Sequence, residues 1–121
     1  MKKTVVIGAS ENPARYSQMA ALLLQKHGHE VVPVGLKDGT INDLSILSLK
    51  DKPEIKNVDT VTLYVGPQHQ PAWFDYILSL KPKRVILNPG TENPELEQLL
   101  KKNGIPFLHA CTLVMLSTEQ Y

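Results

Sequence analysis

The sequence predicts an α/β protein with an open parallel sheet and helices on both faces. Short β-branched and apolar runs recur along the chain, and segments with helical spacing separate most of them. Gly and Pro residues mark the turns between these segments. Strands that alternate with helices favour parallel pairing through right-handed crossovers. At 121 residues the chain is expected to form one domain, covering residues 1–121.

The first predicted strand and turn form the stretch around which the chain is organised. Residues 5–7 (Val-Val-Ile) are β-branched, which is typical of a strand covered on both faces. Gly8 follows and leaves room for a ligand or a helix to approach the backbone closely. Asn12 is a favourable N-cap and Pro13 a favourable first helical residue. The unpaired N–H groups and the dipole of such a helix N-terminus favour an anion.

A helix over residues 13–26 and a second strand follow. The apolar stripe of this helix is expected to comprise Tyr16, Met19 or Ala20, Leu23 and His27. Residues 31–34 (Val-Val-Pro-Val) predict a strand. Its Pro33 lacks the N–H that pairing requires, so we expect it near the strand end or a sheet boundary.

The second half continues the alternation. Polar residues interrupt residues 41–57, where we expect a short strand or an irregular crossover at residues 45–49. The remaining expected elements are a strand (59–65), a helix (67–80), a strand (84–87), a helix (94–102) capped by Asn93 or Thr91, a strand (105–110) and a terminal helix (113–121).

These elements together predict a Rossmann-like open sheet of about five strands in the order 3-2-1-4-5. Ligands of such sheets bind beyond the carboxyl ends of the strands, at the switch point beside the first strand. The predicted turns at that edge follow Gly8, Val34, Val65, Leu87 and Ala110. We therefore expect the functional residues in these turns.

Composition narrows the possible partners and the compartment. The formal charge is +1 with acids and bases interspersed, so no basic field calls for nucleic acid. No apolar run approaches the roughly 20 residues of a membrane span, and no signal-peptide pattern precedes the first strand. The one cysteine, Cys111, excludes an internal disulfide and fits a reducing compartment. We expect a cytoplasmic protein without a membrane or nucleic-acid partner; a homodimer or a partner protein is possible.

The first turn does not match the dinucleotide fingerprint. A dehydrogenase of this class carries G-x-G-x-x-G there, whereas this chain keeps only the first glycine, Gly8. An Asp or Glu should follow the second strand to hold the ribose 2′-hydroxyl, but Lys37 stands near that place. A cation there favours a phosphate on the ribose. The P-loop pattern is absent as well.

Several segments resemble the small bacterial CoA-binding proteins, which share the Rossmann-like CoA-binding domain of the succinyl-CoA synthetase alpha subunit. Residues 6–10 (Val-Ile-Gly-Ala-Ser), followed by Asn12, Pro13, Arg15 and Ser17, look like the opening of that family. Residues 28–34 (Gly-His-Glu-Val-Val-Pro-Val) are similar to its G-Y-x-V-I-P-V-N-P segment. The likeness continues at Lys37, residues 59–61, residues 88–90 and Cys111, in the family's order.

The resemblance implies that the chain binds CoA or an acyl-CoA across the strand ends. Gly8, Ala9 and Ser10 would approach the phosphates, with Arg15 and Ser17 near them. Lys37 would lie near the adenosine 3′-phosphate. The other residues carried over by position are Asn12 and Pro13 in the first turn, Val34 at the end of the second strand, Tyr64 and Val65 on the adenine side, and Asn88 and Gly90 beside the pantetheine arm.

The chain also departs from the family. Gly35 and Leu36 stand where relatives carry Asn-Pro or Ser-Pro, Ile86 and Asn88 occupy the neighbourhoods of a Trp and a Gln, and His-Ala-Cys (109–111) replaces Asp-Arg-Cys. The synthetases' phosphohistidine lies in a further domain, so the sequence supports no ligase chemistry and, more generally, no catalytic residue. Metal-ligand spacing is absent.

Two other interpretations stay open. One is an enzyme, either of an NAD(P)-type nucleotide-dependent class or an acyl-group handler that uses Cys111 with His109. A lone cysteine is more often a small buried hydrophobe. The other is an interaction module that has lost its ligand, motivated by Gly35 and Leu36.

Overall fold

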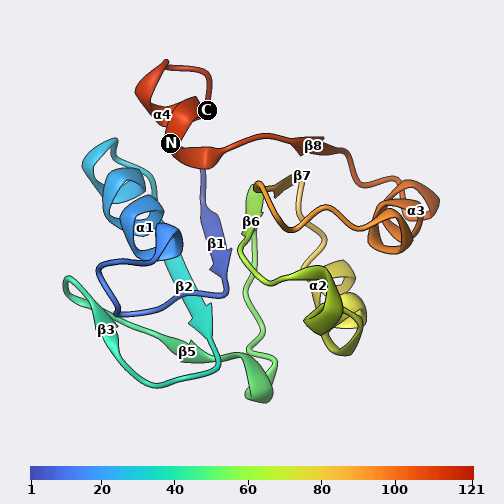
Figure 1. The fold of residues 1–121 in the computed structure, drawn as a ribbon, viewed down its shortest axis with the longest axis horizontal. Helices are drawn as coiled ribbons and strands as arrows, with labels where there is room; N and C mark the ends of the chain where they lie inside the picture. The colour runs from blue at the N-terminus through green and yellow to red at the C-terminus, as the bar shows by residue number, and fades with distance from the viewer.

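A six-stranded parallel sheet forms the centre of the protein in the computed structural model, which describes residues 1–121 (Figure 1). Its strand order is β5-β2-β1-β6-β7-β8. The bounds are β1 (Thr4–Ile7), β2 (Val31–Gly35), β5 (Leu47–Ser48), β6 (Thr60–Leu63), β7 (Arg84–Leu87) and β8 (Phe107–His109). The predicted Rossmann-like class is confirmed. Counted along the chain, the order reads 3-2-1-4-5-6, so the predicted order is extended by one strand at the β8 edge.

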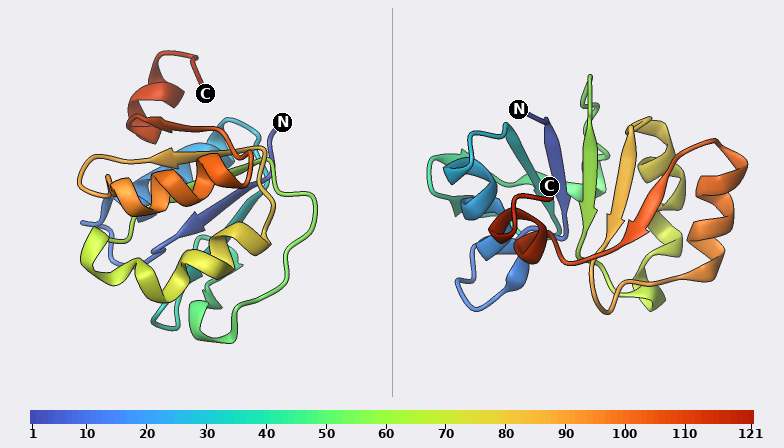
Figure 2. Two further views of the ribbon diagram at one scale, coloured as in Figure 1. Left: turned by 90° about the vertical axis from the view of Figure 1, so that its right-hand side faces the viewer. Right: turned by 90° about the horizontal axis from the view of Figure 1, so that it is seen from above.

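Helices cover both faces of this sheet (Figure 2). They are α1 (Tyr16–Lys26), α2 (Phe74–Ser79), α3 (Pro94–Lys102) and α4 (Thr112–Ser117). Alternate residues of β1 point to opposite faces, as strand geometry requires. Val5 and Ile7 belong to the core cluster that contains residues of α2 and α3, whereas Val6 belongs to the cluster that contains residues of α1 and α4. The β-branched run is therefore buried on both sides, as the sequence indicates.

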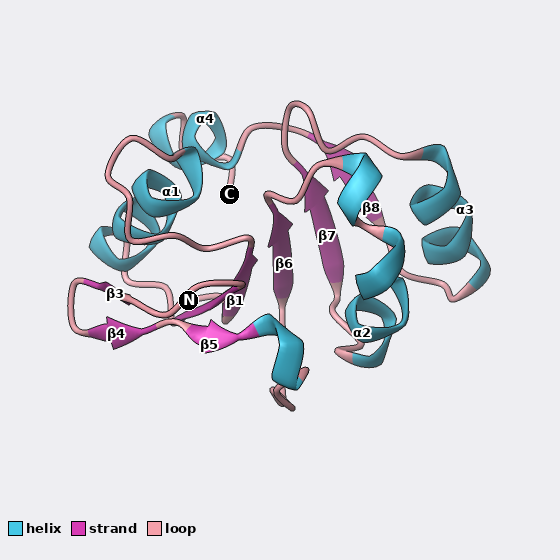
Figure 3. Ribbon diagram, turned by 60° about the horizontal axis from the view of Figure 1, so that its bottom comes forward, coloured by secondary structure: helices cyan, strands magenta, loops and turns pink.

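The crossover from β2 to β6 is irregular, as expected. A small antiparallel hairpin, β3 (Thr40–Ile41) with β4 (Leu44–Ser45), precedes the two-residue strand β5 (Figure 3). β5 pairs with β2 only at Val34 and Gly35. One 3₁₀ turn at Leu49–Asp51 then leads towards β6.

Two helix predictions were wrong at the N-terminal side. α1 begins at Tyr16 instead of residue 13, because residues 12–15 form a turn: Asn12 O accepts from Arg15 N (3.0 Å) and Asn12 Oδ1 from Ala14 N (3.0 Å). Pro13 fits the second position of such a turn as well as it fits a helix start. Asn12 is therefore not the N-cap of α1.

The buried face of α1 also differs from the predicted stripe. It comprises Ser17, Ala20, Ala21 and Leu24, while Tyr16 is exposed. Of the predicted stripe only Ala20, one of its two alternatives, is buried; mainly small side chains, together with Leu24, face the sheet. α2 is shorter than predicted because Pro71 interrupts the helix, and two 3₁₀ turns, Pro67–His69 and Pro71–Trp73, precede it.

Pro33 lies inside β2, but its missing N–H costs no backbone hydrogen bond, because the side to which this position points has no partner strand there. Val34 O accepts from Gly8 N, and Glu30 O accepts from Thr4 N, so the even-numbered residues of β2 point their backbone groups towards β1. Pro33 faces the other side, and there β5 pairs only from Val34 onward. Pro33 therefore lies at a sheet boundary, as expected, because β5 begins to pair with β2 only at the next residue.

Gly35 allows the first loop to close over the end of β2. A Cβ built at Gly35 would lie 2.3 Å from Ala9 O. In the same place Val34 O accepts hydrogen bonds from Gly8 N (2.9 Å) and Ala9 N (3.0 Å). The departure from the family at Gly35 thus has a structural reason in this chain: only a residue without a side chain admits the carbonyl of Ala9.

We predict that Gly35→Ala lowers the free energy of unfolding by about 1–3 kcal/mol, because the added methyl group must displace backbone. Gly66→Ala is the matched control, since Gly66 has an ordinary φ of −64° and the atoms nearest to its added Cβ would belong to the flexible Gln68 side chain. Urea unfolding of both variants measures the difference. Equal stability of the two variants would show that the close approach at Ala9 is not required.

Candidate functional site

A cleft of about 1080 Å³ opens at the carboxyl ends of the strands. Loops after β1, β2, β6 and β7 line it, so the switch point beside β1 is part of its wall. The lining residues are Gly8 to Ser17, Leu36, Lys37, Asp38, Leu49, Tyr64, Val65, Gly66, His69, Pro89, Gly90 and Thr91. This is the edge at which the sequence predicts ligand contacts.

The loop after β1 presents backbone donors to this cleft. Gly8 has φ +95°, and a Cβ there would lie 3.0 Å from the backbone of Tyr64, so the turn requires glycine. The N–H groups of Ser10, Glu11, Tyr16 and Ser17 donate to no group of the chain. Unpaired donors at a helix N-terminus attract an anion.

Two cations accompany these donors. Arg15 and Lys37 are exposed, line the cleft and form no ion pair within the protein. Glu11 and Asp38 also lie in the lining. The Glu11 carboxylate is directed to the β3–β4 hairpin, where Oε2 accepts from Thr40 N (3.2 Å). Arg15 and Lys37 therefore remain free to pair with a ligand phosphate.

All but two of the predicted site residues line the cleft. The predicted residues that line the cleft are Gly8, Ala9, Ser10, Asn12, Pro13, Arg15, Ser17, Lys37, Tyr64, Val65 and Gly90. Val34 and Asn88 are outside the lining, and both are buried. Val34 contributes its carbonyl to the first loop, whereas the side chain of Asn88 faces inward.

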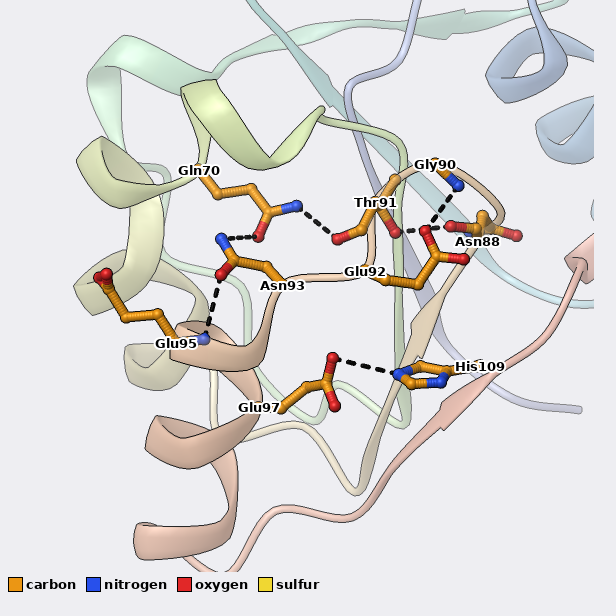
Figure 4. Close-up of polar contacts among 9 residues, drawn as sticks. All are labelled: Gln70, Asn88, Gly90, Thr91, Glu92, Asn93, Glu95, Glu97 and His109. Carbon is orange, nitrogen blue, oxygen red and sulfur yellow. Dashed lines mark hydrogen bonds and ion pairs between the residues drawn. The ribbon is translucent and has the colours of Figure 1, made fainter.

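Asn88, which follows β7, bonds the end of β6 and the start of α4 behind the cleft. Its Nδ2 donates to Thr62 Oγ1 (2.7 Å) and Leu63 O (2.9 Å), and its Oδ1 accepts from Thr112 N (2.9 Å) at the start of α4. Its own carbonyl accepts from Thr91 Oγ1 (2.7 Å; Figure 4). Asn88 was expected beside the pantetheine arm, but its side chain points into the protein and lies behind the cleft wall.

Tyr64 stays protonated at neutral pH. Burial raises the pKa of Tyr64 to about 12, although the hydroxyls of Thr62 and Thr112 oppose the shift. Those two hydroxyls are bonded to each other (2.8 Å), and the Tyr64 hydroxyl is buried without a partner. The ring contributes an apolar surface to the cleft rather than an ionisable group.

Several lining residues are absent from the predicted set. Four of them are sequence neighbours of predicted site residues: Leu36 and Asp38 flank Lys37, and Pro89 and Thr91 flank Gly90. That adjacency is the sequence signal by which they could have been predicted. Leu49 had none, because it reaches the cleft through the irregular crossover. His69 follows the turn after β6 and lies in the lining too.

His109 and Cys111 do not line the cleft. His109 Nε2 lies 3.1 Å from Glu97 Oε2 on α3 (Figure 4), and Cys111 is the residue before α4. The structure has no cluster of three His, Cys, Asp or Glu side chains that would bind a metal ion. None of its helices has the length and apolar character needed to cross a bilayer.

Comparison with known families identifies the class of protein to which this fold and cleft belong. Residues 2–117 match the model of the CoA binding domain, so the chain belongs to this family. The resemblance inferred from the sequence is therefore confirmed.

Individual relatives share sequence or fold with this chain. A crystal structure of an uncharacterized protein is 53% identical, with a TM-score of 0.96, and the match covers 100% of this chain and 98% of that one. The uncharacterized protein YneT of Bacillus subtilis is 28% identical over 105 residues, which cover 85% of this chain and 76% of YneT. A dinucleotide-forming acetyl-coenzyme A synthetase of Ca. Korarchaeum cryptofilum, 18% identical, shares the fold with a TM-score of 0.67, over 88% of this chain and 25% of the synthetase.

We predict that Asn88→Ala lowers the free energy of unfolding by more than about 2 kcal/mol, because each buried group left without its partner costs about 1–3 kcal/mol. Asn103→Ala serves as the control, since Asn103 is exposed and bonds only Leu99 O. Urea unfolding of both variants gives the comparison. If the loss in Asn88→Ala does not exceed that of the control, Asn88 does not hold the strand ends together.

Proposed function

We propose that the chain binds CoA or an acyl-CoA in this cleft and has no ligase chemistry of its own. One observation carries the proposal: unpaired backbone donors and two free cations, Arg15 and Lys37, surround a single cleft in a member of the CoA binding domain family. CoA carries a pyrophosphate and a 3′-phosphate, which such donors and cations suit.

The pyrophosphate would lie on the loop after β1. Gly8, Ala9 and Ser10 would approach it, because the turn at Gly8 brings backbone rather than side chain to the surface. Asn12 and Pro13 shape the turn that carries Arg15, and Ser17 begins the buried face of α1 beside it. Binding there uses main-chain N–H groups and one guanidinium.

The rest of the ligand would follow the other loops. Lys37, at the end of β2, would pair with the 3′-phosphate, and Tyr64 and Val65 would lie on the adenine side. Gly90 would border the pantetheine arm, with Asn88 supporting it from behind. An acyl group would extend beyond that end of the cleft.

Two further expectations accompany this function. We propose that residues 1–121 act as one binding domain, since both core clusters pack on the same sheet. We also propose a cytoplasmic location, which fits the one free cysteine.

Calorimetry with CoA, dephospho-CoA and NAD tests the proposal. We expect CoA to bind at least about tenfold more tightly than dephospho-CoA, because a hydrogen bond to a charged group contributes about 1.5–3 kcal/mol. In Lys37→Ala that preference should disappear, whereas Lys102→Ala, an exposed lysine on α3, should keep it.

Three results would contradict parts of this account. Equal binding of CoA and dephospho-CoA by the unmodified protein would remove the role of Lys37. Binding of NAD alone would favour the nucleotide-dependent enzyme, and binding of none of the three would favour an interaction module.

A further inference from the structure

Gln70 is a fully buried polar side chain between two of the loops that line the cleft. Its exposed fraction is 0%, and it lies between the two 3₁₀ turns that precede α2. Nε2 donates to Val65 O (2.9 Å), in the loop after β6, and to Thr91 O (2.7 Å), in the loop after β7 (Figure 4). One amide group therefore connects the two loops directly.

Asn93 fixes the orientation of this amide. Asn93 Nδ2 donates to Gln70 Oε1 (3.1 Å), while Asn93 Oδ1 accepts from Glu95 N (3.1 Å) as the N-cap of α3. A flipped Gln70 amide would set its oxygen against two carbonyl oxygens and its NH₂ against the NH₂ of Asn93. The network therefore permits one arrangement.

The loops after β1 and β2 are held in place by different contacts from the loop after β7. Tyr64 N donates to Ile7 O (2.8 Å), and Val34 O fixes the loop after β1, so the walls at β1, β2 and the start of the β6 loop are joined through the sheet. Thr91 is bonded to Asn88 O within its own loop. Beyond this internal bond, Asn88 ties the start of the loop after β7 to the last residues of β6. Gln70 ties Thr91, further along that loop, to Val65 in the loop after β6.

We propose that Gln70 is a positioning residue for the pantetheine end of the ligand: it holds the wall at Pro89, Gly90 and Thr91 at the distance that the arm of CoA requires. The proposal rests on the proposed function. Gln70 is absent from the cleft lining, so its effect passes through the Thr91 carbonyl and the backbone of its loop.

Gln70→Glu is the sharpest variant. Glu keeps the shape of the side chain and an acceptor for Asn93, but it cannot donate to both carbonyls: the ionised form donates to neither Val65 O nor Thr91 O, and the protonated form donates to one of them. We expect CoA to bind about tenfold more weakly. Adenosine 3′,5′-bisphosphate, which lacks the pantetheine arm, should lose less affinity than CoA, because the Thr91 end of the link borders the arm and only its Val65 end lies on the adenine side.

Two controls accompany this measurement. Gln68→Glu makes the same change of charge at an exposed position two residues away and should leave both affinities unchanged. Asn93→Asp keeps the N-cap acceptor for Glu95 N but loses the donor to Gln70, so it should weaken CoA binding selectively and by less than Gln70→Glu. Thermal melting establishes that each variant is folded; if Gln70→Glu is not, Gln70→Met and Asn93→Asp provide the comparison.

The outcomes separate the two proposals. If the unmodified protein binds neither CoA nor the bisphosphate, the proposed function fails. If it binds CoA and the folded Gln70 variant binds CoA equally well, only the role of Gln70 fails. An equal loss for both ligands would also overturn that role, because the effect would then not be specific to the pantetheine end.

Discussion

The close approach of the first loop to the end of β2 is the constraint on which the site depends. Val34 O accepts from both Gly8 N and Ala9 N, and the absence of a side chain at Gly35 admits Ala9 O. These contacts hold the loop in place before it turns at Asn12 into α1. The N–H groups of Ser10 and Glu11 in this loop are unpaired, and those of Tyr16 and Ser17 are unpaired because they begin α1. An anion site thus follows from backbone geometry, and the side chains of Arg15 and Lys37 add the charge.

The sequence was sufficient for the parts of the fold that local pattern determines. The β-branched residues of β1 predict a strand buried on both faces. β7 and α3 have the predicted bounds, and those of α3 are marked plainly by Asn93, Pro94 and Gly104. Pattern was insufficient where two structures suit the same residues. Asn12 and Pro13 fit a turn as well as a helix start, and the depth of burial along α1 depends on what packs against it.

The candidate site also contains residues that the sequence could identify and residues that it could not. Residues at strand ends, such as Gly8, Lys37 and Gly90, could be identified because parallel strands bring their carboxyl ends to one edge. The buried polar groups could not, because only the folded structure brings Gln70 to Val65 and Thr91, or Asn88 to Thr62 and Thr112. Gly35 was a departure in the sequence, and its reason became evident only from the position of Ala9.

Amide chemical-shift changes on titration with CoA test the central claim most directly. The account predicts saturable changes that are largest at the unpaired N–H groups of Ser10, Glu11, Tyr16 and Ser17, with further changes at Lys37 and Gly90. The depression formed by residues 54–58, 79–81 and 83, which carries three lysines and lies outside this cleft, should not respond. Changes confined to that depression, or no saturable change in the loop after β1, would contradict the account.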